Sequence, residues 1–583
     1  MPNQSGNPKV TIAGAGVAGL AAAHRLLERN YDVTLLEADA FFGGKLGAHR
    51  DVGVDAPDHD RPARTCPACA AQGGCLGRQD WHEHCYHMYL NWYHNFWALM
   101  DEIGALDNFR PASTVYNMYP RAPDAASSPA LPMVNVGSPW TVLANMRAGV
   151  GTPLDILLWG QALLDLAAAP ERQGPMLERT SVTAFMQALP YATDQALAGT
   201  YRTTAQAFAS PSYLSSARSY RALLSYGLRL PEPSMWLLAA STEQGIFTPW
   251  LAHLARIARH VEINPSGMLP PAPEGGGRGG NLTVKMLTPL QQIHLDPRTG
   301  RVTRVDVAEC KISPSVHRSK WKVKSGSKQS LPIEGDLILA LPPDELSWMV
   351  RPDVARRAPE LANARYLRCE PMMSIDLFFK RRLEGLPNGI TVLLDSRYQM
   401  SFLDTSQAWR YLAGGNTVLN VVASDADTLA ARFYADNDII GLLLRELQRY
   451  VAFTPETDLF TCRTHLETNV GERLFVNQVG SWQWRPETTC GIPNLYIAGD
   501  HCKTVIDVVT VEGAVVSGLM AAEAVRRRHG HGRPIDIRVP DQYPVAALGA
   551  LAAAQRPFAY FARALAAGDS ALRRGYRQWF PNG

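Results

Sequence analysis

The sequence has almost no excess of either charge and no long apolar run. Its 583 residues include 57 Lys and Arg against 54 Asp and Glu, a net charge of +3, and the basic residues are scattered. This balance argues against nucleic acid as a partner, because phosphate backbones are bound by clustered positive charge. No apolar run reaches the roughly 18 residues that cross a bilayer, and the polar first nine residues lack a secretion signal's apolar core. We therefore expect a cytoplasmic protein.

Cysteine is also scarce, and most of the nine cysteines are dispersed. Such a composition excludes a disulfide-rich scaffold. Four cysteines are close together in the sequence, namely Cys66, Cys69, Cys75 and Cys85. They leave three interpretations open: free thiols in a surface loop, a tetrahedral zinc site that pins the loop, or a disulfide, which a cytoplasmic location disfavours.

A glycine-rich turn near the N-terminus is the most informative feature that is present. It follows an apolar stretch over 10–13, precedes a helical stretch to Arg29, and reads Gly14-Ala15-Gly16-Val17-Ala18-Gly19. In a strand–turn–helix unit, Gly14 permits the tight turn, Gly16 lets the backbone approach a pyrophosphate, and Gly19 lets the helix pack close to the sheet. The free N–H groups at the helix start favour an anion. The pattern predicts a dinucleotide-binding unit.

Two further features identify which dinucleotide this unit binds. Glu37 follows the second predicted strand, 23 residues after Gly14, where a carboxylate accepts hydrogen bonds from a ribose and repels the 2′-phosphate of NADP. Ala38 then leads to a second glycine pair with a cation, Gly43-Gly44-Lys45. A simple NAD site does not require this second loop, which suits the pyrophosphate and ribityl chain of FAD.

The far end of the chain supplies the other half of the predicted site. An apolar strand over 492–498 runs into Gly499 and Asp500, and a small-residue helix begins at Glu512-Gly513-Ala514. Asp500 suits a ribityl hydroxyl or a contact on the pyrophosphate side, and the start of the helix can point its N–H groups at the flavin pyrimidine. We therefore predict that two segments nearly 500 residues apart close on one FAD molecule.

These segments resemble the FAD-dependent phytoene and carotenoid desaturases of the flavin amine oxidase superfamily. The similarity rests on four stretches: Leu36-Glu37-Ala38 with Gly43-Gly44-Lys45-Leu46, residues 80–104 from Asp80-Trp81-His82 to Glu102-Ile103-Gly104, Ala498-Gly499-Asp500, and residues 512–518 from Glu512 to Gly518. The chain departs from the family at Cys85, His94 and His501, and it carries an insertion over about 57–79. The departures affect the identity of the substrate.

The resemblance implies an α/β fold with a Rossmann-type FAD-binding domain of the glutathione-reductase-like kind and an interleaved α+β substrate domain. We expect the FAD domain over 1–110, 281–345 and 481–530, a helix-rich substrate part over 111–280, a substrate sheet over 346–480, and a C-terminal helical extension over 531–583. In the family, the segment near Leu290 contacts the adenine. Short apolar stretches near 373–379, 390–394 and 418–422 are expected to form the substrate sheet.

The implied activity is dehydrogenation of an apolar, carotenoid-like or isoprenoid substrate, with quinone or oxygen as the electron acceptor. Two alternatives stay open: a flavin amine oxidase that produces an imine and hydrogen peroxide, and an FAD-dependent isomerase or hydratase without net redox change. Candidate catalytic residues are His87, which occupies the family's histidine position, the aromatic pair Trp482 and Trp484, and His501. The pair either flanks the substrate or packs beneath the cofactor strand.

The C-terminal stretch over 545–567 is rich in alanine and leucine and is followed by Arg573, Arg574 and Arg577. Pro557 is expected to break or kink it, giving a helix pair. Such a pair either lies in a membrane interface, where an apolar substrate or a quinone could enter, or packs on the protein's own surface. The first alternative would make the protein peripheral to the membrane.

Overall fold

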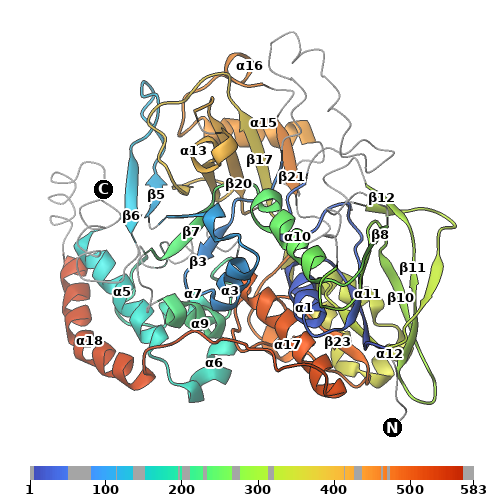
Figure 1. The fold of residues 1–583 in the computed structure, drawn as a ribbon. Coiled ribbons are helices and arrows are strands. Elements are labelled where there is room, and N and C mark those ends of the chain that lie inside the picture. The colour runs from blue at the N-terminus through green and yellow to red at the C-terminus, as the bar shows by residue number, and fades with distance from the viewer. Residues whose placement is uncertain are drawn as a thin grey trace.

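The computed structural model describes most of the chain, and Figure 1 shows its ribbon. The described residues are 6–49, 81–112, 114–134, 152–194, 197, 199, 210–227, 233–264, 276–312, 321–412, 414–425, 436–460, 464–468 and 473–568. Three of the four clustered cysteines, Cys66, Cys69 and Cys75, lie outside the described residues, as does Arg573 with the arginines that follow it.

A six-stranded parallel sheet forms the cofactor side of the molecule. Its strands run in the order β23-β15-β1-β2-β9-β8, and every neighbouring pair is parallel. The chain contributes these strands from four separate regions: β1 (Lys9–Ala13), β2 (Asp32–Leu36), β8 (Val261–Asn264), β9 (Leu282–Lys285), β15 (Asp336–Leu339) and β23 (Leu495–Ile497). β8 lies before the expected boundary at residue 281, so the second contribution to this sheet begins about 20 residues earlier.

Both faces of the parallel sheet are covered, as its buried apolar strands require. One face packs against α1 (Val17–Leu27), α3 (His94–Glu102), α10 (Thr248–Ile257) and α17 (Val511–His529). The other face packs against α11 (Pro343–Met349), α12 (Pro352–Arg357) and an antiparallel sheet of β10 (Leu290–Leu295), β11 (Val302–Val307) and β14 (Gln329–Pro332). α1 and α17 approach closely, because a side chain at Gly518 would collide with the carbonyl oxygen of Ala18.

A seven-stranded mixed sheet forms the substrate side and lies above the cofactor side in Figure 1. Helix α15 (Asp436–Leu447) packs on one face, with Ile439, Leu443 and Leu447 buried against the strands. The strands, in sheet order, are β21 (His465–Thr468), β17 (Met373–Phe378), β20 (Val418–Ala423), β19 (Met400–Asp404), β18 (Thr391–Leu393), β5 (Thr114–Met118) and β6 (Ala130–Val134). This arrangement confirms the predicted class, a Rossmann-type domain interleaved with a mixed substrate domain.

A small antiparallel sheet lies between these two parts of the molecule in Figure 1. It consists of β3 (Met88–Leu90), β7 (Met235–Leu238) and β4 (Phe109–Pro111). The aromatic residues around it, including Trp92, Phe96 and Trp250, are buried in the core beside α1 and α3.

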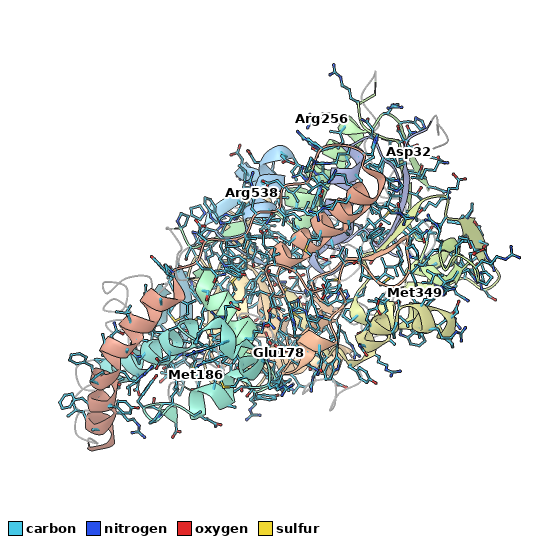
Figure 2. All side chains as sticks on the ribbon, turned by 90° about the horizontal axis from the view of Figure 1, so that it is seen from below. Asp32, Glu178, Met186, Arg256, Met349 and Arg538 are labelled. Carbon is cyan, nitrogen blue, oxygen red and sulfur yellow. The ribbon has the colours of Figure 1, made fainter. Side chains whose placement is uncertain are left out.

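A helical layer completes the molecule at the end opposite to Asp32, as the view from below shows with Met186 labelled (Figure 2). It contains α5 (Pro153–Ala167), α6 (Gly174–Glu178), α7 (Val182–Gln187), α9 (Ala217–Gly227) and α18 (Val545–Gly568). α18 runs through Pro557 as one helix, so the expected helix pair is wrong. A proline removes only one backbone donor, and α18 is held on α5 by buried Ala559 and Ala562.

Candidate cofactor and substrate site

The two glycine-rich loops of the N-terminal region meet in space. The N–H of Gly43 donates to the carbonyl of Ala15 over 3.0 Å, and Gly16 and Gly43 form a parallel bridge. Gly43 and Gly44 both adopt positive φ, 109° and 55°, a region that L side chains rarely occupy. The two loops, which are separated by 24 positions from Gly19 to Gly43, therefore form a single backbone cradle.

The three glycines of the first turn have different roles. A side chain at Gly14 would collide with the carbonyl oxygen of Ala340, and one at Gly19 would collide with that of Gly14. A Cβ at Gly16 would lie 3.7 Å from the carbonyl oxygen of Gly43, an ordinary contact distance, and would project into the cavity that Gly16 lines. Gly14 and Gly19 thus allow close packing, whereas Gly16 keeps the cradle open for a ligand.

Glu37 lies at the carboxyl end of β2, where its position agrees with a ribose site. Its carboxylate accepts the N–H of Ala15 over 2.7 Å and the N–H of Asp39 over 2.8 Å. The side chain is thereby fixed beside the first turn while Glu37 still lines the cavity. A carboxylate held in this way is preorganised for a ribose hydroxyl.

Lys45 and Asp500 join the N-terminal loop to the C-terminal loop. Lys45 Nζ lies 3.2 Å from Asp500 Oδ1, and both side chains are largely buried. Burial by itself would raise the pKa of Asp500, but the charges of Lys45 and the contact with His501 hold that pKa below its usual range. Asp500 is therefore an anion at neutral pH, and the pair closes the site from two ends of the chain.

The N-terminus of α17 faces the same cavity. Thr510 caps the helix, because its Oγ1 accepts the N–H of Gly513 over 3.1 Å, and Val511 and Ala514 line the cavity. Glu512 turns the other way: it is fully buried and accepts hydrogen bonds from the backbone N–H groups of Asn95 and Phe96. We therefore interpret Glu512 as a residue that positions α17, rather than one that contacts the cofactor.

A cavity of about 380 Å³ connects all of these groups. Most of the predicted cofactor residues line it, while Ala15, Gly19, Glu512 and Gly513 lie behind its wall. The predicted cofactor residues that line the cavity are Gly14, Gly16, Val17, Ala18, Glu37, Ala38, Gly43, Gly44, Lys45, Leu290, Gly499, Asp500 and Ala514.

The cavity continues from the cradle into the substrate domain. There its wall includes Tyr220 and Leu223 of α9, Met372, Val422 of β20, and Phe475. No local pattern in the sequence pointed to these residues, because they come from different elements and form no motif. Among the described lining residues, the carboxylates Glu37, Asp39, Glu345 and Asp500 all belong to the loops and helix that follow strands of the parallel sheet.

The four candidate catalytic residues are placed very differently. His87 lines the cavity. His501 is fully buried behind it, and burial lowers the pKa of His501, so its ring is neutral at pH 7. Trp482 and Trp484 are not among the cavity-lining residues: the guanidinium of Arg218 lies 4.0 Å from the Trp482 ring centre, and Trp484 packs on Tyr366. This geometry favours packing over substrate contact for both tryptophans.

A buried polar network that sequence reasoning missed supports the loop before His87. His82 Nδ1 lies 2.7 Å from Asp376 Oδ2, and Asn420 donates to the other oxygen of Asp376 over 2.8 Å. The carbonyl of Glu83 accepts the Ser374 hydroxyl over 2.5 Å. The network ties the loop to β17 and β20, and no local motif could have revealed it.

Comparison with known proteins agrees with this geometry. Residues 276–526 match the family described as flavin containing amine oxidoreductase, and residues 12–76 match the NAD(P)-binding Rossmann-like domain. Residues 276–526, which include the C-terminal segments of the cofactor site, are therefore similar to flavin-containing amine oxidoreductases. This similarity identifies the protein as an oxidoreductase enzyme and implies an FAD-type cofactor.

Relatives of this flavoenzyme are distant but extend over most of its length. It is 23% identical over 551 residues to a 15-cis-phytoene desaturase of Synechococcus elongatus, a match that covers 90% of this chain and 99% of that protein. The corresponding enzyme of Arabidopsis thaliana is 22% identical over 89% of this chain and 80% of its own length. Cyclohexylamine oxidase from Brevibacterium oxydans shares the fold, with a TM-score of 0.54 at 14% identity over 90% of this chain and all of that one.

The residues of the flavoenzyme's cradle fit an FAD molecule. The space beside Gly16 suits a pyrophosphate, Glu37 suits the ribose, and the region near Leu290 suits the adenine. Lys45, Asp500 and the start of α17 are left for the flavin half. None of the helices in the described ranges is long and apolar enough to cross a membrane.

Proposed function

We propose that this flavoenzyme dehydrogenates an apolar, carotenoid-like or isoprenoid substrate. The observation that carries the proposal is the distribution of charge along the cavity. Its carboxylates lie on the cofactor side, whereas the substrate side presents apolar and uncharged polar groups among the described lining residues. The apolar ones include Leu223, Met372, Val422 and Phe475, and the polar ones include Ser215, Ser219 and Asn477. An ammonium substrate needs a compensating anion or an aromatic cage, while an extended hydrocarbon needs only an apolar wall.

Bound FAD would supply the chemistry by accepting a hydride from the substrate at N5. The protein's own residues contribute binding and orientation. Met372 directly precedes β17 and Val422 lies in β20, and both pack together with Cys85, Tyr86 and Leu474 as one apolar cluster. This cluster excludes water from the cavity wall, and the substrate is oriented by shape rather than by ion pairs.

Anaerobic titration of the purified yellow protein tests the proposal. An isoprenoid panel and an amine panel are added separately, and the visible absorbance of oxidised flavin is followed. We expect an isoprenoid to bleach the flavin once and the reaction then to stop until quinone or oxygen is admitted. Bleaching by amines alone, with hydrogen peroxide released in air, would contradict the proposal, as would turnover without bleaching or any external acceptor.

A peripheral contact with membranes is part of the same proposal, because such substrates partition into lipid. Support comes from α18, where Phe558 and Phe561 are 69% and 66% exposed although the helix packs on α5 through its alanines. Amphipathic helices with exposed aromatic residues bind the membrane interface through their apolar face.

A further inference from the structure

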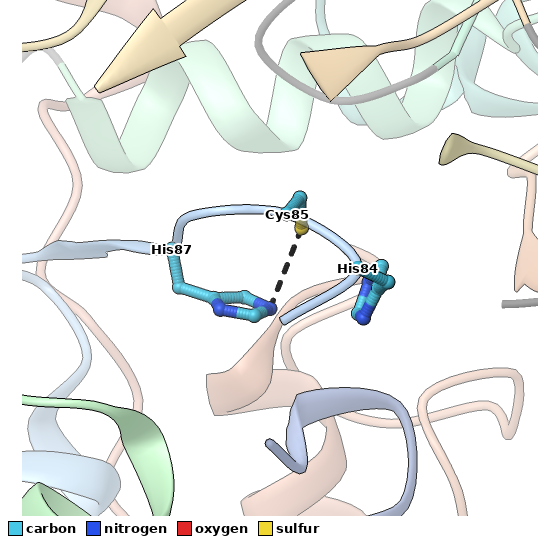
Figure 3. Close-up of side chains that lie close together, drawn as sticks. All are labelled: His84, Cys85 and His87. Carbon is cyan, nitrogen blue, oxygen red and sulfur yellow. Dashed lines mark hydrogen bonds between the residues drawn. The ribbon is translucent and has the colours of Figure 1, made fainter. Parts of the chain in front are cut away.

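A cluster of three metal-ligating side chains lies in the cavity wall next to the cofactor loops. His84, Cys85 and His87 all line the cavity, and their ligand atoms lie within 4.8 Å of one another. Figure 3 shows the three residues on one tight loop, with the Cys85 sulfur turned toward the His87 ring. The proposed dehydrogenation gives none of these three groups a chemical role, and Cys85 enters it only as part of the apolar wall.

Two separations within the cluster agree with the bond geometry of zinc. Cys85 Sγ lies 3.5 Å from His87 Nε2, and the ring centres of His84 and His87 are 5.3 Å apart. Zinc bonds of about 2.3 Å to sulfur and about 2.0 Å to nitrogen at a tetrahedral angle separate these two atoms by about 3.5 Å. The same geometry separates the centres of two imidazole ligands by about 5 Å.

A carboxylate lies near the second ring nitrogen of His87, the place where a metal-binding histidine commonly has one. Its Nε2 faces the sulfur, whereas its Nδ1 lies 3.5 Å from Glu83 Oε2. Glu83 is buried and is fixed in turn, because its other oxygen accepts the N–H of Thr242 over 2.7 Å. Histidine ligands characteristically donate their second ring nitrogen to such a carboxylate, which orients the ring and raises its basicity.

We propose that His84, Cys85 and His87 bind one zinc ion whose fourth coordination position opens into the cavity. Thiolate sulfur and imidazole nitrogen are both ligand types that zinc binds. Three protein ligands with an open position are typical of reactive zinc sites, and the open position would accept water or an oxygen or sulfur donor of a molecule in the cavity. This site differs from the zinc site of Cys66, Cys69, Cys75 and Cys85 considered from the sequence, since it needs only the last of those cysteines.

Cobalt substitution in the flavin-loaded protein tests the proposal. The starting protein carries Cys66→Ser, Cys69→Ser and Cys75→Ser, which removes the other clustered thiols, and is freed of metal by a chelator. We expect one equivalent of Co²⁺ to give the intense absorption of tetrahedral cobalt in the red, beyond the absorption of oxidised flavin, and Zn²⁺ to abolish it. Absence of this absorption from the starting protein would overturn the proposal.

Single variants in the same background assign the ligands. His84→Ala, Cys85→Ser and His87→Ala should each weaken Zn²⁺ binding more than roughly 100-fold, and Glu83→Gln roughly 10- to 100-fold. Cys490→Ser is the matched control, because Cys490 is half-buried and lies near Leu495, and it should bind Zn²⁺ unchanged. Flavin content and the unfolding midpoint are measured for each variant. The assignment is contradicted if folded Cys85→Ser binds Zn²⁺ with unchanged affinity. It is also contradicted if the two single variants Glu83→Gln and His87→Ala are folded and both bind Zn²⁺ with unchanged affinity.

Discussion

Lys45 and Asp500 form an ion pair across 455 positions of sequence, with Nζ 3.2 Å from both carboxylate oxygens. The pair links the second glycine loop to the loop after β23 and lies in the wall of the cavity. Because both side chains are largely buried, removing either one leaves the other charge without its partner in a poorly solvated place. The two halves of the cofactor site are therefore electrostatically dependent on each other.

Replacing Lys45 with Met should weaken FAD binding by about 2 kcal/mol, or roughly 30-fold in Kd, because Asp500 would repel the cofactor phosphates without compensation. Fluorescence titration of the flavin-free protein with FAD measures this change. The control is Lys9→Met, which removes an ion pair with Glu334 whose side chains are 57% and 59% exposed. FAD affinity that survives in Lys45→Met, or falls equally in both variants, would contradict the role of the pair.

The first turn offers a contrast between two glycines of one motif. Gly16→Ala should leave the unfolding free energy nearly unchanged but raise the Kd for FAD at least roughly tenfold, because the new methyl group enters the cradle. Gly19→Ala should lower the unfolding free energy by about 2 kcal/mol, because its Cβ collides with the Gly14 carbonyl. Urea unfolding and FAD titration of both variants separate the two effects. Equal losses of stability would show that Gly16 serves packing instead.

Glu512 should make stability depend on pH. Burial raises the pKa of Glu512 from its ordinary value of about 4.5 to about 7, so the folded state holds a proton that the unfolded state releases. Between pH 4.5 and pH 7 this residue therefore destabilises the fold as the pH rises, by up to about 3 kcal/mol over the window. The free energy of unfolding of the wild type and of Glu512→Gln is measured with urea at several pH values. As the pH rises through this window, the stability of Glu512→Gln should increase relative to that of the wild type.

Glu523, on the same helix, provides a control of opposite sign. Its hydrogen bonds with Arg526, together with the other contacts around it, lower the pKa of Glu523 to about 2. It therefore contributes stability that is fully present above pH 4.5 and is lost as the pH falls toward 2. Glu523→Gln should accordingly cost most stability at neutral pH and least in acid. A pH-independent difference between wild type and Glu512→Gln would refute the assignment for Glu512.

The exposed aromatic residues of α18 should determine membrane contact. The double variant Phe558→Ser with Phe561→Ser should reduce co-sedimentation with vesicles of phosphatidylcholine and phosphatidylglycerol at least roughly tenfold, since each phenyl ring contributes buried apolar area. Flavin content should stay unchanged because neither ring lines the cavity. The matched control is Trp348→Ser on α11, which removes a ring that is 75% exposed elsewhere. Equal co-sedimentation of the wild type, the double variant and Trp348→Ser with the vesicles would exclude α18 as the membrane contact.

Much of the cofactor site was predictable because its signals are local. Gly14, Gly16 and Gly19 have roles set by the turn in which they lie, and Glu37 follows from its distance to that turn. The apolar stretches near 373–379, 390–394 and 418–422 also became strands of one sheet, as expected. Each of these inferences needs only neighbouring residues and the repeat of a strand or helix.

Other features depended on contacts that no short stretch contains. Glu512 belongs to a cofactor motif, yet its carboxylate faces the N-terminus of α3. Pro557 was expected to break or kink the C-terminal helical stretch, but α18, packed on α5, continues through it as one helix. For Trp482 the sequence left substrate contact and packing open, and in the structure its ring lies against Arg218.

Turn chemistry and strand periodicity were therefore enough to indicate a flavin-binding fold, since both are properties of consecutive residues. The folded chain decided three other features: the direction in which Glu512 points, the pairing of Lys45 with Asp500, and the placing of Glu83 and Cys85 at the two nitrogens of the His87 ring. The reason is physical: these groups acquire their partners, their burial and their charge environment only when segments hundreds of residues apart, or a loop and the sheet behind it, pack together.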